Sequence, residues 1–87
     1  MPTRYGVSFI NQHGNRWLLG PNQGRHFHDT RAGAQAWLDA CFENTGEDRL
    51  VSVCGEQARG TFRVSAFDCY DNGDAKGWSP KEPDGPG

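Results

Sequence analysis

Apolar residues recur with a helical period in one stretch of the chain, Arg31–Asn44. Their spacing of i, i+3, i+4, i+7 and i+8 places the side chains on one stripe of a helix. The residues on this stripe are Ala34, Trp37, Leu38, Cys41 and Phe42. Asp29 or Thr30 can cap the start, and Gly46 can end the helix in a left-handed turn. We therefore predict one amphipathic helix here.

Alternation of apolar and polar residues predicts short strands on both sides of this helix. The predicted strands cover residues 4–10, 16–19 and 25–28 before the helix and residues 50–54 and 61–70 after it. The dipeptide Asn72-Gly73 predicts a tight hairpin turn, and a sixth short strand could return as far as Trp78. The expected order is β-β-β-α-β-β.

Short connections favour antiparallel neighbours, and one helix covers only one face of a sheet. We expect a two-layer α+β domain over residues 1–78, with an antiparallel sheet of about five strands, the helix on one face and the other face open. Residues 79–87 hold three prolines and two glycines and are expected to form a disordered tail.

The alternation also assigns side chains to the two faces of the sheet. The side chains expected to face the helix are Tyr5, Val7, Phe9, Trp17, Leu19 and Phe27. The side chains expected on the open face are Arg4, Ser8, Arg16, His26 and His28. Because guanidinium and imidazole groups pair with phosphates and carboxylates, this second set is the predicted binding face.

Composition allows one folded domain with a thin core. Only 14 of the 87 residues are Leu, Ile, Val or Phe, although three Trp and two Tyr add apolar area. The chain shows neither an apolar run long enough to span a membrane nor a signal-peptide pattern. Its three cysteines, Cys41, Cys54 and Cys69, do not form a disulfide framework, so we expect a cytoplasmic location.

Charge is divided between the two halves of the chain. Residues 1–38 carry four arginines, all three histidines and one acid, whereas residues 39–87 carry ten acids and five bases. Such asymmetry indicates a charged partner. The isoelectric point of about 5.8 favours a protein over nucleic acid as that partner, because nucleic-acid binders depend on net positive charge.

The sequence shows no signature of catalysis. No serine or cysteine sits in a nucleophile elbow, and no glycine-rich loop opens a helix as a phosphate site does. His26 and His28 point the same way from a strand and could begin a metal site, but ordinary strand alternation explains them better. We therefore predict no enzyme activity, no cofactor and no metal, and keep a metal-dependent site at His26 and His28 as a second alternative.

Residues 27–38, after a short meander, loosely resemble the N-terminal arm-binding domains of tyrosine recombinases. In that family a three-stranded sheet reads DNA and a helix backs it, so the resemblance implies nucleic-acid binding. Those domains are basic throughout, whereas ten acids follow the helix here. The resemblance therefore does not assign a family to the chain.

We predict that the protein is a small, non-enzymatic protein-interaction module, and we expect it to be an accessory protein of a bacterium or a mobile element. Its partner is another protein or a second copy paired through an edge strand. The alternative is a nucleic-acid-binding module that uses the arginine- and histidine-bearing face, and no membrane association is expected.

Overall fold

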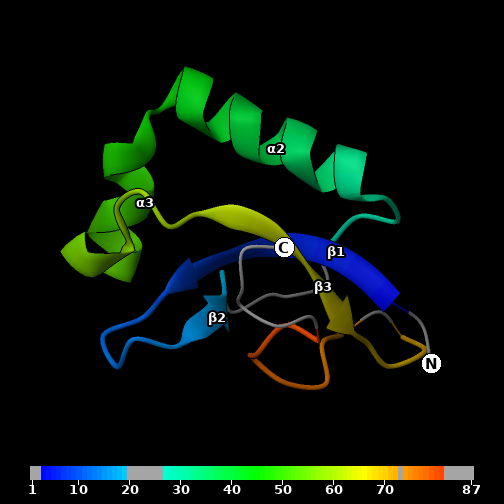
Figure 1. The fold of residues 1–87 in the computed structure, drawn as a ribbon. Coiled ribbons are helices and arrows are strands. Elements are labelled where there is room, and N and C mark those ends of the chain that lie inside the picture. Colours follow the sequence, from blue (N-terminus) through cyan, green and yellow to red (C-terminus); the bar gives the residue numbers. More distant parts are fainter. Residues whose placement is uncertain (1–2, 20–26, 73, 82–87) are drawn as a thin grey trace.

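The computed structural model describes residues 3–19, 27–72 and 74–81. The elements in chain order are β1 (Thr3–Ile10), β2 (Arg16–Leu18), α2 (Arg31–Asn44), α3 (Glu47–Cys54), the 3-10 turn η1 (Glu56–Ala58) and β3 (Arg63–Asp68). The strands form one antiparallel sheet in the order β2-β1-β3, and α2 lies across one face of it (Figure 1). The α+β class is confirmed. The prediction of about five strands and one helix is wrong in number, because the described residues form a three-stranded sheet and two α-helices.

The helix α2 matches its prediction closely. Thr30 is the N-cap, and its Oγ1 accepts a hydrogen bond from the backbone N–H of Gly33 at 3.0 Å. Ala34 and Leu38 are buried on the predicted stripe. Gly46 follows the helix with a φ of 79° and a ψ of 165°, a conformation open to glycine but not the left-handed turn that we expected, and its N–H donates to the carbonyl of Phe42.

The predicted strand over residues 50–54 is wrong, because these residues belong to the helix α3. Glu47 and Asp48 occupy the first turn, where carboxylates stabilise the positive end of the helix dipole. Val51 is buried while Val53 is exposed, which a strand with both on one face would not produce. A stretch of five residues, four of them apolar, is too short to distinguish the helical from the strand period, and the acidic residues before it favour a helix.

Two other predicted strands are reduced to single bridges within the described residues. His28 and Tyr5 exchange backbone hydrogen bonds of 2.8 and 2.9 Å beside β1, while residues 25 and 26 lie outside the described part. After β3, the N–H of Tyr70 donates to the carbonyl of Asp74 at 2.7 Å, which confirms a turn there. One bridge between Cys69 and Ala75 stands where the return strand was expected.

The core lies on both faces of the sheet, so the prediction of one open face is wrong. The cluster between sheet and helices contains the buried residues Val7, Phe9, Leu19, Leu38 and Ala58. A second cluster on the opposite face contains Leu18, Phe27, Phe67 and Cys69. Phe27, which we expected under the helix, thus packs on the other face, where Gly6 leaves room: a β-carbon at Gly6 would lie 3.0 Å from the Phe27 ring.

The chain after β3 covers this second face. It runs beneath the sheet, opposite α2, in the orange part of the ribbon in Figure 1. The carbonyl of Trp78 accepts a hydrogen bond from the N–H of Leu18 in β2 at 2.7 Å, and the N–H of Lys81 donates to the carbonyl of Ala66 in β3 at 2.9 Å. Residues 79–81 of the predicted tail are therefore attached to the sheet, and residues 82–87 lie outside the described part.

Candidate functional site

The predicted binding face does not form an exposed plane. Ser8 is fully buried in the middle of the sheet, and Arg16 extends over it. Arg4 lies further along β1, and His28 lies next to Tyr5 in the segment before α2; both are half-buried. The structure brings Ser8 and Arg16 together in one hydrogen-bond network, but the second cluster covers the face around them. His26 lies outside the described residues.

The network around Ser8 has a structural role. The guanidinium of Arg16 donates to Ser8 Oγ at 3.0 Å and to the carbonyl of Thr61 at 2.8 Å. Ser8 Oγ also lies 2.8 Å from Ser65 Oγ on β3, and both serines are buried. Buried hydroxyls are stable only when hydrogen-bonded, so Arg16 and the two serines satisfy one another at the centre of the sheet.

Replacing Ser8 by alanine is expected to lower the free energy of unfolding by about 1–3 kcal/mol, because it leaves the Ser65 hydroxyl buried without this partner. The double variant Ser8→Ala/Ser65→Ala should lose less than the sum of the single variants. Urea unfolding of the three proteins measures this coupling, with the exposed Ser52→Ala as control. Additive losses would contradict the network.

Arg4 and His28 sit at the other end of the sheet, near the start of α2. The Nη2 group of Arg4 donates a hydrogen bond to the carbonyl of Phe27 at 3.4 Å. The Nε atom of Arg4 lies 3.5 Å from a carboxylate oxygen of Asp29. Nε2 of His28 is buried and makes no hydrogen bond with a described residue. These contacts attach the segment before α2 to β1, which is a structural use of the predicted binding residues.

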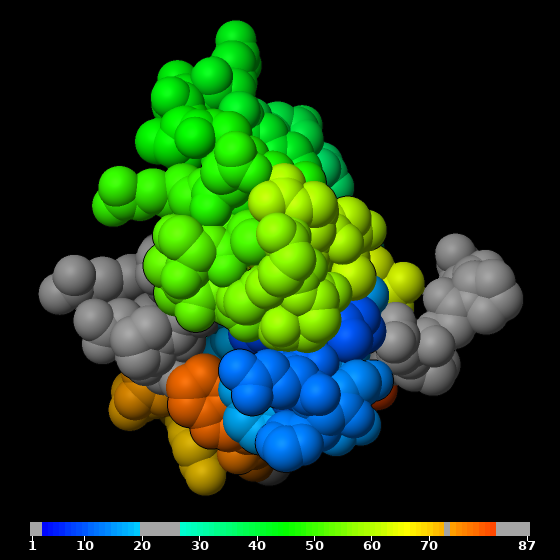
Figure 2. Space-filling view, turned by 90° about the vertical axis from the view of Figure 1, so that its left-hand side faces the viewer, coloured from blue at the N-terminus to red at the C-terminus, as the bar shows by residue number. Residues whose placement is uncertain are grey.

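A cleft on another part of the surface is the best candidate for a functional site. It lies between the β1–β2 hairpin and α3, with the C-terminal segment at one side, and its volume is about 380 Å³. The lining residues are Phe9, Asn11, Gln12, His13, Trp17, Leu18, Leu19, Val53, Cys54 and Trp78. Figure 2 views the molecule from this side, with α3 in green above the hairpin in blue and part of the C-terminal segment in orange.

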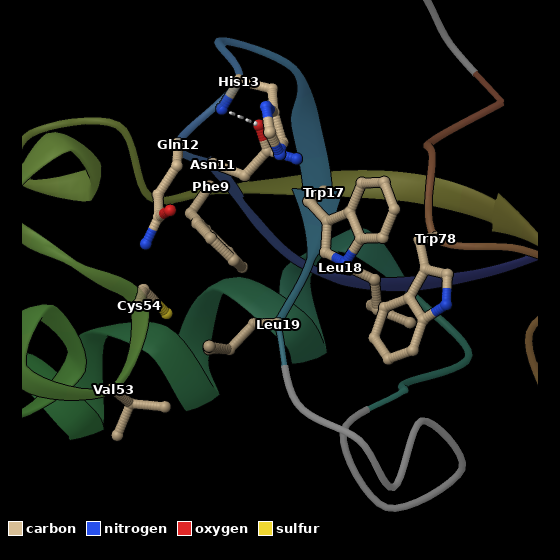
Figure 3. Close-up of a pocket in the computed structure, with 10 residues that line it drawn as sticks. All are labelled: Phe9, Asn11, Gln12, His13, Trp17, Leu18, Leu19, Val53, Cys54 and Trp78. Carbon is tan, nitrogen blue, oxygen red and sulfur yellow. Dashed lines mark hydrogen bonds between the residues drawn. The ribbon is translucent and has the colours of Figure 1, made fainter.

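Two tryptophans form one wall of the cleft. The rings of Trp17 and Trp78 stack at a centroid distance of 5.5 Å and an interplanar angle of 11°. Figure 3 shows the pair on one side, Val53 and Cys54 on the other, and Phe9 and Leu19 between them. Because the Trp78 carbonyl is bonded to Leu18, the second ring is held at the outer edge of β2.

The polar residues of the cleft are neutral amides and one histidine. The side-chain oxygen of Asn11 accepts hydrogen bonds from the backbone N–H groups of His13 at 2.9 Å and Asn15 at 3.0 Å. This arrangement fixes the Asn11 amide at the turn of the hairpin. No Asp, Glu, Lys or Arg is among the lining residues that the structure describes, so the cleft fits an uncharged, partly apolar ligand.

Cys54 is the nucleophilic side chain in the cleft, and its environment makes it a weak nucleophile. Burial raises its pKa to about 11, because the thiolate loses hydration. A catalytic cysteine needs a lowered pKa, since the thiolate is the reactive form. The raised pKa therefore makes Cys54 a poor candidate for the nucleophile of a covalent reaction.

Neither a metal site nor a membrane span is found in the described part of the chain. No group of three or more His, Cys, Asp or Glu side chains is arranged to hold a metal ion there. None of the helices in ranges 3–19, 27–72 and 74–81 has the length and apolar character needed to cross a membrane. The alternative metal site at His26 and His28 is not tested, because His26 is outside those ranges.

Sequence reasoning missed the cleft because it combines three distant segments. Trp17 and Leu19 were assigned correctly to the helix-side face, but nothing in the pattern indicated that Trp78 would stack on Trp17. One signal was present: Trp78 is a single aromatic residue followed by Ser79 and Pro80 and preceded by Gly77, at the far end of the short strand that we expected. An exposed aromatic residue in such a setting is a candidate binding residue.

Comparison of the chain with family models, with curated proteins and with solved structures finds no match.

Proposed function

We propose that the protein is a non-enzymatic interaction module that binds a partner protein at the cleft of Trp17 and Trp78. The observation that carries this proposal is the stacked tryptophan pair across the cleft from exposed Val53, with no charged residue among the described lining residues. Exposed apolar and aromatic side chains that gather in one place are typical of interaction sites.

The contacts of the arginines favour a protein over a nucleic acid as partner. The guanidinium of Arg31 lies 5.0 Å from the Tyr5 ring centroid, and that of Arg59 bonds Asp48 at 2.8 Å and Glu56 at 2.6 Å. Arg4 and Arg16 also bond within the fold. Nucleic-acid affinity depends on cations that neutralise phosphates, and these arginines already contact groups of the protein itself.

Selection of peptides from a displayed random library tests the proposal. Peptides enriched on the native protein should bind Val53→Glu at least tenfold more weakly, because the new carboxylate enters an uncharged cleft. Ser52→Glu is the matched control, since it adds the same charge at an exposed position of the same helix. It should leave binding unchanged.

Three results would contradict the proposal: no enriched peptide, equal binding to both variants, or a salt-dependent shift of duplex DNA in place of peptide binding. The last of these would favour the nucleic-acid alternative.

Alkylation of Cys54 at a pH near 9, followed by mass spectrometry, gives an independent measure of how much of the cleft is occupied. Only a small fraction of this thiol is ionised there, because its pKa is about 11, and a bound peptide should slow the reaction further.

A further inference from the structure

The segment that supplies Trp78 to the cleft is attached to the sheet at few points. Before this segment, the N–H of Lys76 donates to the carbonyl of Asp68 at the end of β3, at 3.0 Å. We propose that residues 77–81 form a strap that detaches as a unit while the three strands stay paired, and that its detachment takes the cleft apart. This inference rests on the proposed function and concerns the regulation of the same cleft.

The strap is hydrogen-bonded to both edges of the sheet. At β2, the carbonyl of Trp78 accepts from the N–H of Leu18 at 2.7 Å, and at β3 the N–H of Lys81 donates to the carbonyl of Ala66 at 2.9 Å. The strap passes beneath the sheet, on the side opposite α2 (Figure 1). Because these two bonds hold one short segment at both edges, we expect them to break in one event.

The side chains of the strap contribute little to holding it in place. None of residues 77–81 is buried, and Trp78 is 39% exposed. The ammonium group of Lys81 lies 3.4 Å from the Asp68 carboxylate, but both side chains are nearly half exposed, and such ion pairs stabilise a fold only slightly. The helix α2, by contrast, buries two side chains over the opposite face. Segments with few buried apolar contacts open at a lower free energy than the whole domain.

Gly77 gives the strap a hinge at its start. A β-carbon at Gly77 would meet no atom within 4 Å beyond its chain neighbours, so no packed side chain fixes the backbone there. Hinges are a few residues that absorb the backbone rotation of a moving segment, and glycine has the widest choice of backbone angles. Rotation at Gly77 would move Trp78 away from the sheet while Lys76 stays bonded to β3.

Detachment of the strap removes one wall of the cleft. The ring of Trp78, which stacks on Trp17, would leave with the strap. The hairpin and α3 would keep their side of the cleft, with Leu19 and Val53 in place (Figure 3). An occupant that contacts Trp78 therefore binds the attached form and favours it over the detached form.

Hydrogen exchange at two adjacent amides tests the detachment. The N–H of Leu18 is bonded to the strap, whereas the N–H of Leu19 is bonded to the carbonyl of Val7 in β1 at 2.9 Å. After correction for intrinsic rates, the Leu18 amide should exchange at least about tenfold faster than the Leu19 amide. The Lys81 amide, at the other edge of the sheet, should report the same opening equilibrium as Leu18. Nuclear magnetic resonance of the intact chain measures all three rates.

Substitutions in the strap but outside the cleft should change this exchange in opposite directions. Lys81→Pro removes the N–H that bonds Ala66, so exchange at Leu18 should become about two- to tenfold faster. Lys81→Ala keeps that N–H and is the matched control, with little change expected. Gly77→Ala should slow exchange at Leu18 about two- to fivefold, because alanine restricts the detached strap and Gly77 has no positive φ. The Leu19 amide should not respond to these changes in the strap.

A peptide from the library selection connects the strap to the cleft. At about ten times its dissociation constant, it should slow exchange at Leu18 and Lys81 about tenfold, because the strap can then detach only from unoccupied molecules. Unchanged rates in the presence of the peptide would show that the strap detaches without taking the cleft apart, which would overturn the inference.

Equal protection of the Leu18 and Leu19 amides would also overturn the inference, as would different opening equilibria at Leu18 and Lys81. Equal acceleration of Leu18 and Leu19 by Lys81→Pro would do the same, because the whole sheet would then open with the strap. In each of these cases, selected peptides whose binding depends on Val53 would leave the proposed function standing. If no peptide is selected, the proposed function fails, and the regulatory role of the strap fails with it even where Leu18 exchanges faster than Leu19.

Discussion

Replacing Phe67 by alanine is expected to lower the free energy of unfolding by about 3–5 kcal/mol, the cost of deleting a large aromatic side chain from a packed core. Phe67 is 1% exposed, and its ring meets that of Phe27 edge-on at a centroid distance of 5.5 Å. Because a domain of this size has only a few kcal/mol of net stability, much of the variant should be unfolded at 25 °C. Urea unfolding followed by far-ultraviolet circular dichroism measures the loss.

Tyr70→Ala is the control for this prediction. Tyr70 lies three residues later and is 52% exposed, with Lys76 over its ring. Its removal should change stability by no more than about 1 kcal/mol. A Phe67→Ala protein as stable as Tyr70→Ala would show that the face opposite α2 does not contain a second core.

Replacing Leu38 by alanine should have the next largest effect, a loss of about 2–5 kcal/mol in the free energy of unfolding. Leu38 is 2% exposed and belongs to the cluster with Val7 and Phe9, where α2 meets the sheet. The alanine would leave a cavity at that contact. Thermal and urea unfolding should report the same loss, since both faces of the sheet belong to one cooperative domain.

Val53→Ala provides the comparison for Leu38→Ala. It removes methyl groups from a helix position that is 75% exposed, so the expected change is within about 0.5 kcal/mol. If the two variants lost equal stability, α2 would not be packed on the sheet as described.

The sequence predicted α2 and the three strands of the sheet but not the helix α3, for physical reasons. The apolar stripe of α2 repeats from Ala34 to Phe42, about two and a half helical turns, so one period dominates, and Thr30 was one of the two N-cap residues expected. The run over residues 50–54 is too short to separate the helical from the strand period. Glu47 and Asp48 contained the missing information, because acids before an apolar run favour the start of a helix.

The open face was predicted wrongly because alternation assigns side chains to a side of the sheet without showing what covers that side. Phe67 alternated with Val64 and Ala66 and was therefore on the far face, where an aromatic ring needs burial. The cover is supplied by residues after β3, a segment poor in apolar side chains. Among its described residues, Cys69 and Ala75 belong to or pack against the second cluster.

The candidate cleft was beyond the reach of pattern analysis. Its walls come from the hairpin, from α3 and from Trp78, and the two stacked tryptophans are far apart in the sequence. The distribution of charge instead indicated the arginines as binding residues. In the structure, Arg4 and Arg16 donate hydrogen bonds to backbone carbonyls, and Arg16 also donates to the Ser8 hydroxyl. The sequence shows that Trp17 and Trp78 are present but does not show that their rings stack in the fold.

Because Trp78 stacks on Trp17 and forms one wall of the cleft, the cleft is complete only while the segment around Trp78 is hydrogen-bonded to β2. Any occupant therefore binds the native state alone, and mass action shifts the equilibrium away from denatured molecules as its concentration rises. In a cell, where proteases remove the denatured fraction, the lifetime of such a marginal domain would follow the supply of its partner.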